Sequence, residues 1–203
     1  STARRSANVP PLILNVITDL RIGGAQRMLL ERLRRPGPYR HAVLAFARHT
    51  GVLPGGPAAP PDLYDALRGT GATIHLLDLA DPRQALAAWA RGTLDRALAR
   101  IAAADPPAVI HSTLFHSHLL GARLARRTGA PHVAGKEGTD DWMGGAQRFL
   151  EARALRSAAR VVAVSEAAAR AARQHAARPD RIRVIPNGID LDGTAPWTPP
   201  PPP

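Results

Sequence analysis

Short apolar runs alternate with longer amphipathic stretches along most of this chain. Each run spans four to seven residues and is bounded by polar or turn-forming residues, which is typical of a buried β-strand. The predicted strands are Leu12–Thr18, His41–Ala47, Thr73–Leu77, Ala108–His111, His132–Gly135, Arg160–Val164 and Ile182–Ile185.

The stretches between these runs carry apolar residues at helical spacing. A long one opens at Asp81-Pro82, another ends at Gly129, and Ser165 precedes a third. These are the positions that side-chain caps, first-turn prolines and terminal glycines occupy in helices. The predicted helices are Ala25–Arg35, Asp62–Arg68, the long helix from Asp81, Ser117–Thr128, Gln147–Ser157 and Glu166–His175.

The alternation of strands and helices predicts an α/β fold. Strands joined by helices pair in parallel through right-handed crossovers, so we expect a doubly wound, Rossmann-like parallel sheet with helices on both faces. This domain is expected over residues 12–190, after a flexible segment at 1–11 and before a proline-rich tail at 191–203. Such sheets bind ligands at the carboxyl ends of their strands, near the point where the strand order reverses.

Charge and composition narrow the classes of function. The chain has a formal net charge of +11, carried almost entirely by arginine because Lys136 is its one lysine. The arginines are scattered through predicted helices without interleaved aromatic residues. We therefore expect solvated helix faces and no nucleic-acid partner, with peripheral contact to an anionic membrane as the second interpretation. No cysteine is present, which excludes disulfides, zinc–thiolate sites and a cysteine nucleophile.

The apolar runs also bear on location. No run approaches the ~20 residues that span a bilayer, and Ser1–Pro11 lacks the apolar core of a signal peptide. We expect a cytoplasmic protein, in contact at most with the inner face of the membrane.

Gly23 and Gly24 lie directly between a predicted strand and a predicted helix. Glycines there let a ligand approach the backbone, and the free N–H groups of a helix start favour an anion. The pair is therefore a candidate phosphate site, and a plain turn is the alternative. Neither a Gly-x-Gly-x-x-Gly fingerprint nor a P-loop lysine accompanies the pair, which argues against a dehydrogenase and a nucleoside triphosphatase.

Three histidines lie close together around the end of the fourth predicted strand. His111 ends that strand, and His116 and His118 begin the next helix. A histidine at a strand end can hydrogen-bond a sugar hydroxyl or a phosphate, or act as a base. We take His116 and His111 as candidate catalytic residues, with a structural role equally open for His111, and expect His118 at the surface. No carboxylate or cysteine stands at a ligand spacing, so no metal site is expected.

Two further polar segments follow predicted strands. Lys136 and Glu137 open the loop KEGTDD, where the lysine is positioned to meet a phosphate as a point charge. The alternative is a solvated connection in which Asp140 or Asp141 caps the next helix. Ser165 follows the sixth strand; helix capping explains it fully, and anion binding is the alternative.

Five segments match one family in their order and spacing. They are ILNVITDLRIGGAQRMLLERL at Ile13–Leu33, VIHSTLFHSHLLGARLARRTGAP at Val109–Pro131, KEGTDDWM at Lys136–Met143, VVAVSEAAARAA at Val161–Ala172 and IRVIPNGIDLD at Ile182–Asp192. Together they resemble the N-terminal domain of the retaining glycosyltransferases of family four, from its Gly-Gly loop to its Pro-Asn-Gly hinge.

The resemblance implies one half of a GT-B architecture, in which two Rossmann-like domains face a cleft. The N-terminal half would bind a saccharide or lipid-linked acceptor, and the C-terminal half a UDP- or GDP-linked sugar, without a metal or other cofactor. Gly23 and Gly24 would face donor or acceptor phosphates, beside the histidines. The other expected substrate-binding residues are Thr113, Lys136, Glu137, Ser165 and Asn187.

The chain departs from the family's pattern at several positions. Thr113 stands where many members have a second histidine, Gln26 where many have glutamate, and Lys136-Glu137 where many have Glu-His. The chain also runs into prolines where the family continues into its donor-binding domain. We therefore expect an enzyme half, inactive alone, that needs a donor-binding domain or subunit. The alternative is a non-catalytic, transferase-like interaction module.

Overall fold

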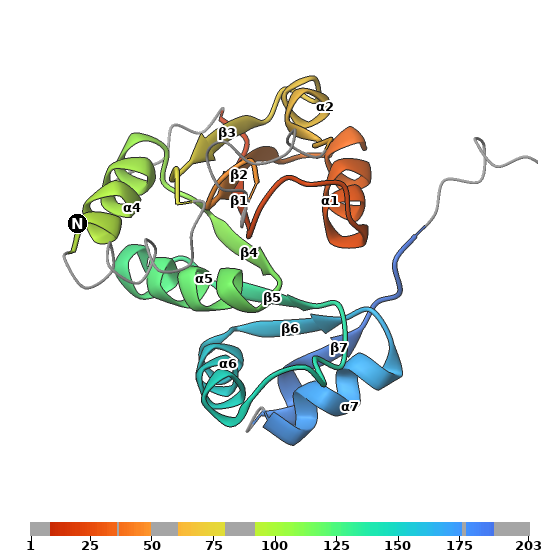
Figure 1. Ribbon diagram of the computed structural model, residues 1–203. Coiled ribbons are helices and arrows are strands. Elements are labelled where there is room, and N and C mark those ends of the chain that lie inside the picture. Colours follow the sequence, from red (N-terminus) through yellow and green to blue (C-terminus); the bar gives the residue numbers. More distant parts are fainter. Residues whose placement is uncertain (1–8, 36, 50–60, 80–91, 176–177, 189–203) are drawn as a thin grey trace, which may run out of the picture.

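Seven strands among the residues that the structure describes form one all-parallel sheet in the computed structural model of the chain (Figure 1). The described residues are 9–35, 37–49, 61–79, 92–175 and 178–188. The strand order is β3-β2-β1-β4-β5-β6-β7. The strands are β1 (Leu12–Ile17), β2 (Arg40–Ala45), β3 (Thr73–Leu76), β4 (Val109–Thr113), β5 (His132–Lys136), β6 (Arg160–Ala163) and β7 (Ile182–Val184).

Helices pack on both faces of this sheet, as predicted. Two helices, α1 and α2, pack over β1, β2 and β3 on one face, and α4 to α7 follow one another across the other face (Figure 1). The described helices are α1 (Gly24–Arg34), α2 (Tyr64–Arg68), α4 (Thr93–Ala104), α5 (Phe115–Thr128), α6 (Gly145–Ser157) and α7 (Glu166–His175), with a 3-10 turn, η1 (Pro179–Arg181), before β7.

Alternating side chains of β1 supply two separate cores. Leu14 packs with Leu98 of α4 and Leu124 of α5, whereas Ile17 packs with Leu30 of α1 on the other face. Successive side chains of a strand point to opposite faces, so one short apolar run can serve both cores. Complete burial of each such side chain contributes about 1.5–3 kcal/mol.

The strand order reverses between β1 and β4. The helix that follows β1 packs on one face, and the helix that follows β4 packs on the other, so the loops after these strands diverge. A crevice at this switch point is where open α/β sheets bind ligands. The Gly23-Gly24 loop follows β1, and residues 114–116 follow β4, so both lie at the carboxyl ends of the two strands between which the order reverses. Thr18 Oγ1 and Ser117 Oγ lie 3.4 Å apart across the two sides.

The end of β4 differs from the prediction. The backbone of Ser112 and Thr113 pairs with β5, and such pairing does not depend on side-chain polarity. His111 therefore lies inside the strand and not at its end. α5 begins at Phe115, two residues earlier than predicted, which places His116 in its first turn.

Helix ends follow the sequence signals closely, with one exception. Gly129 ends α5 in the left-handed region at φ 74°, and the Ser165 hydroxyl accepts the backbone N–H three residues on at 3.1 Å. The predicted capping roles of both residues are confirmed. α6, however, is preceded by Gly144, so the alternative interpretation, in which Asp140 or Asp141 caps this helix, is wrong.

Several predicted segments lie wholly or largely outside the described residues. They are the N-terminal segment at 1–11, the loop Arg48–Pro61, the first part of the predicted long helix from Asp81-Pro82 and the tail at 191–203. The domain limits therefore stay predictions. The described helix of the predicted long stretch, α4, begins only at Thr93, after Gly92 in the left-handed region at φ 67°, so the prediction of one continuous helix from Asp81 is wrong. None of the described helices is long and apolar enough to cross a bilayer.

Candidate functional site

The Gly23-Gly24 loop presents an open helix start at the switch point. Gly23 has an extended backbone, and no side chain caps the start of α1. A Cβ at Gly24 would meet no atom within 4 Å, whereas a Cβ at Gly23 would lie 2.6 Å from Gln26 Oε1. Gly24 thus borders open space beside uncapped N–H groups and the positive end of a helix dipole, which suits an anion.

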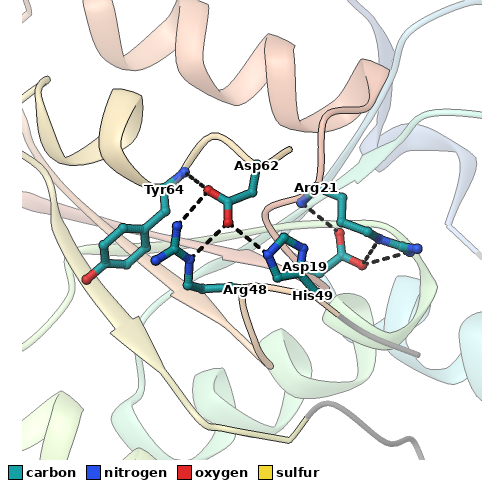
Figure 2. A network of polar contacts seen from close by, with 6 residues as sticks. All are labelled: Asp19, Arg21, Arg48, His49, Asp62 and Tyr64. Carbon is teal, nitrogen blue, oxygen red and sulfur yellow. Dashed lines mark hydrogen bonds and ion pairs between the residues drawn. The ribbon is translucent and has the colours of Figure 1, made fainter. Parts of the chain in front are cut away.

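Asp19 stabilises this loop through hydrogen bonds. Its carboxylate is buried and accepts a hydrogen bond from Gln26 Nε2 at 3.1 Å. It also accepts one from Arg21 Nε at 2.9 Å (Figure 2). Glutamine at position 26 donates an amide N–H to Asp19, whereas a glutamate there would set two carboxylates against each other. The departure from the family's usual glutamate therefore fits the local electrostatics.

The β4–α5 junction contains a strained backbone. Leu114 has φ 78° and ψ 156°, a region that favours glycine and costs other residues about 1–3 kcal/mol. Its side chain packs against the core on the α1 side, which keeps the conformation in place. The strain sets the direction in which α5 leaves the sheet, and therefore the position of His116.

His116 lies beside the ring of Phe115, which in turn contacts Trp142. Its side chain is exposed, and its ring centroid lies 4.9 Å from that of Phe115. Phe115 is buried and meets Trp142 edge to face, with centroids 6.4 Å apart. Trp142 itself is 63% exposed. An exposed indole held by a buried ring is a suitable platform for the apolar face of a sugar.

A pocket of about 260 Å³ lies on the α1 side of the sheet, where β4, β5 and the chain after β7 meet. His111, Glu137, Asn187 and Arg32 line it together. The Asn187 Nδ2 donates to Glu137 Oε2 at 3.4 Å. Burial raises the pKa of Glu137, while Asn187 and the positive charge of Arg32 oppose that rise. The pocket thus brings together three of the residues predicted from sequence.

His111 is a neutral hydrogen-bonding group in this pocket. Burial, followed by the positive charge of Arg32, lowers its pKa to about 3. Its Nδ1 has no hydrogen-bond partner among the described atoms, and a Cβ on Gly135 would lie 3.4 Å from the ring. A histidine with so low a pKa is a weak base, so hydrogen bonding to a substrate suits it better than proton abstraction.

Lys136 does not face this pocket. Its side chain is 1% exposed and lies on the α6 side, where Nζ donates to Glu151 at 2.9 and 3.0 Å and to Asp140. Asp140 therefore pairs with Lys136 and does not cap α6, contrary to the alternative interpretation. The ammonium is held by two carboxylates, so it is not presented to a phosphate at the switch point.

A second polar network at the same edge was not singled out from the sequence. Asp62 accepts hydrogen bonds from Arg48 at 2.9 and 3.1 Å and from the Tyr64 backbone at 2.9 Å, and lies 3.0 Å from His49 Nε2 (Figure 2). The Arg48 guanidinium also lies 4.3 Å above the Tyr64 ring centroid. The sequence offered one signal that could have identified this network: Arg48 and His49 come directly after a predicted strand.

His118 was expected at the surface, but it is buried. Its Nδ1 lies 2.9 Å from Ser112 Oγ, which also lies 2.7 Å from His132 Nε2. Burial lowers the pKa of both histidines, that of His132 to about 4. A single hydroxyl therefore joins two neutral imidazoles beneath α5.

The predicted site residues thus fall into three groups. Gly23, Gly24, Thr113 and His116 border the switch point, and His111, Glu137 and Asn187 share the adjacent pocket. Lys136 is buried on the other face, and Ser165 caps α7. Among the described residues, no three histidine or carboxylate side chains are grouped to hold a metal ion.

Residues 22–192 match the profile of Glycosyltransferase Family 4. The chain belongs to this family. The fold agrees, because HepE from Anabaena, solved with UDP, aligns over 91% of this chain with a TM-score of 0.68 and 20% identity. The lipopolysaccharide outer core galactosyltransferase WaaB, in its apo form, aligns over 89% with a TM-score of 0.63 and 11% identity.

A second kind of enzyme shares the fold of this family member. UDP-GlcNAc 2-epimerase from Neisseria meningitidis, bound to UDP-GlcNAc, aligns over 85% of the chain with a TM-score of 0.57 and 13% identity. The chain covers 46%, 46% and 45% of HepE, WaaB and the epimerase, so it spans just under half of their length. The fold is therefore one half of a GT-B architecture. No curated protein sequence matches the chain.

Proposed function

We propose that the chain is the acceptor-binding half of a retaining, nucleotide-sugar-dependent glycosyltransferase. A donor-binding domain or partner subunit would complete the nucleotide pocket. The proposal rests on the family 4 match of residues 22–192 and on the open helix start at Gly24 after β1. The exposed His116 and Trp142 follow the neighbouring strands β4 and β5. HepE was solved with UDP and with UDP-glucose, which supports a UDP-linked sugar as donor.

Each group has a role that follows from its chemistry. The start of α1 would stabilise a phosphate of the donor or acceptor through backbone N–H groups. His116 would hydrogen-bond a hydroxyl of the reacting sugar, and Trp142 would stack under the acceptor ring. His111 and Glu137 would bind the substrate from the side of the Pro-Asn-Gly hinge. Asn187 of that hinge, in the chain that follows β7, donates a hydrogen bond to Glu137.

Nucleotide binding tests whether the donor is bound by this half or by the donor-binding half. We expect the chain alone to bind UDP and GDP no more tightly than about 1 mM in a calorimetric titration, because a donor-binding half supplies most of the nucleotide contacts. Gly145 offers a matched control for Gly24: each is the first residue of a helix, and a Cβ on either meets no atom within 4 Å. Clear nucleotide binding that is lost in Gly24→Leu and kept in Gly145→Leu would mean that this half holds the nucleotide itself.

Trp142 provides a separate test of acceptor binding. We expect Trp142→Ala, assayed with the donor-binding half supplied, to raise the acceptor KM about tenfold, the loss of roughly 1.4 kcal/mol of binding. The donor KM should stay unchanged because the ring lies on the acceptor side. Tyr39→Ala, which removes another exposed ring, is the control. Equal effects of the two substitutions on the acceptor KM would remove Trp142 from the site.

A further inference from the structure

A pocket of about 370 Å³ lies at the amino-terminal edge of the sheet, between the ends of α5 and α6. Its polar lining comes from Arg126, Arg160, Arg181, His132 and Ser157, and alanine and proline side chains form the rest. β5 separates this edge from the switch point by four residue steps, which is about 13 Å. The pocket is therefore separate from the site proposed for glycosyl transfer.

The three arginines reach the pocket from different elements. Arg126 lies in the last turn of α5, Arg160 begins β6, and Arg181 ends η1. The neighbouring Arg123 and Arg127 of α5 are both paired with a carboxylate. Within the described part of the chain, no carboxylate forms an ion pair with any of the three pocket arginines. Three arginines thus line one pocket without a described counter-charge.

Backbone contacts hold two of these guanidinium groups in place. Arg181 Nη1 donates to the Ala158 carbonyl at 3.0 Å, and Arg160 Nη1 donates to the Ala159 carbonyl at 2.8 Å. Each guanidinium carries five N–H donors, so several donors remain for another acceptor. A planar group held in this way suits the oxygens of a phosphate, which it can bind through two parallel hydrogen bonds.

His132 adds a buried polar atom beside the arginines. The residue is 2% exposed, and its Nε2 is engaged by Ser112 Oγ at 2.7 Å. Its Nδ1 is buried and has no hydrogen-bond partner among the described atoms. Because Nδ1 has almost no exposed surface, His132 forms part of the pocket wall, and the arginines supply the groups that would bind an anion.

We propose that this pocket binds a phosphate-bearing anion. The phosphate would lie among Arg126, Arg160 and Arg181 with His132 beside it, and an organic body would lie against the alanine and proline lining. A soluble phosphate ester and the headgroup of an anionic phospholipid offer the same chemistry. This anion would be a ligand additional to the donor and acceptor of the proposed transfer reaction.

Calorimetry with inorganic phosphate and with phenyl phosphate, in a buffer of low ionic strength, tests the site on the full chain. We expect saturable binding by the unsubstituted chain, weakened about tenfold by Arg126→Gln and again by Arg160→Gln, because each removes charge-assisted hydrogen bonds. Arg100→Gln is the control, since Arg100 is an exposed arginine of α4 that does not line the pocket. Circular dichroism checks that each variant is folded.

Two further measurements separate the outcomes. Phosphate should shift the ¹⁵N signals of the His132 ring and leave those of the His116 ring unchanged. A second measurement is co-sedimentation of the chain with phosphatidylglycerol vesicles, compared with phosphatidylcholine vesicles. The ligand is a lipid headgroup if the chain binds the phosphatidylglycerol vesicles, the arginine substitutions abolish that binding, and free phosphates bind only weakly. Binding that Arg100→Gln weakens equally, or no saturable binding of any probe below about 10 mM, would overturn the proposal. Neither result bears on nucleotide or acceptor binding at the switch point.

Discussion

Replacing Lys136 by methionine is expected to lower the free energy of unfolding by about 3–5 kcal/mol. The side chains of Lys136 and Glu151 are each 1% exposed, and their charged atoms lie 2.9 Å apart. Methionine retains much of the side-chain volume but leaves the Glu151 carboxylate buried without this cation. Most of the expected loss comes from that buried charge and not from lost packing. Urea unfolding at neutral pH measures the change.

A double variant separates the buried charge from the packing. Lys136→Met combined with Glu151→Leu should recover most of the loss, because apolar pairs of similar volume often replace a buried ion pair at little cost. Arg34→Met is the surface control, since Arg34 pairs with Glu31 where both side chains are partly solvated, and it should lose less than about 1 kcal/mol. If Lys136→Met were no less stable than that control, the pair would not be buried in solution.

Acidification is expected to destabilise the fold by roughly 5 kcal/mol between pH 7 and pH 4.5, through His111 and His132 together. Their pKa values in the folded protein are lowered to about 3 and about 4. The unfolded chain binds these protons near the ordinary pKa of 6.5, so it is favoured as the pH falls below that value. Each histidine then contributes about 2–3 kcal/mol at pH 4.5, and the loss levels off below the folded-state pKa.

Other titratable groups add to this loss, oppose it or act in a different pH range. His118 adds to the loss, because burial lowers its pKa well below 6.5. The lowered pKa values of Asp62 and Asp95 act below their ordinary value of 3.8, beneath this window. Glu137 has a raised pKa, so its protonation slightly favours the folded state as the pH falls.

Urea midpoints at pH 7, 6, 5 and 4.5, together with histidine ring signals in the folded chain, check this prediction. His132→Gln should reduce the slope of stability against pH, because it removes one of the groups that the unfolded state protonates first. If the ring signals of His111 and His132 titrate near pH 6.5 while the chain is still folded, the proposed cause is wrong.

The sequence predicted the fold class and much of the candidate site. The alternating apolar positions of β1 identified a strand, and Ser165 and Gly129 marked helix ends at the correct residues, because these signals depend on neighbours in the chain. Gly23 and Gly24 were placed between a strand and a helix for the same reason. The family resemblance added the order of the remaining motifs, and the match over residues 22–192 confirms it.

The errors share one physical cause. Lys136 was expected in a loop, but β5 extends to include it, and side chains alternate along a strand. Lys136 therefore shares a face with Ala134 and meets Glu151, which lies on a separate helix. His118 was expected at the surface for a similar reason: its partner Ser112 became a strand residue only once β4 continued past His111.

The sequence by itself determined the order of strands and helices, the parallel sheet and the glycine loop at the start of α1, because hydrophobic period and capping residues report local backbone conformation. Only the tertiary structure decided which face receives each polar side chain and which distant residues meet. Arg126, Arg160 and Arg181 share one pocket, and Glu137 meets Asn187, because packing joins separate elements. A buried charge or hydrogen-bonding group takes its properties from such partners, and no local pattern specifies them.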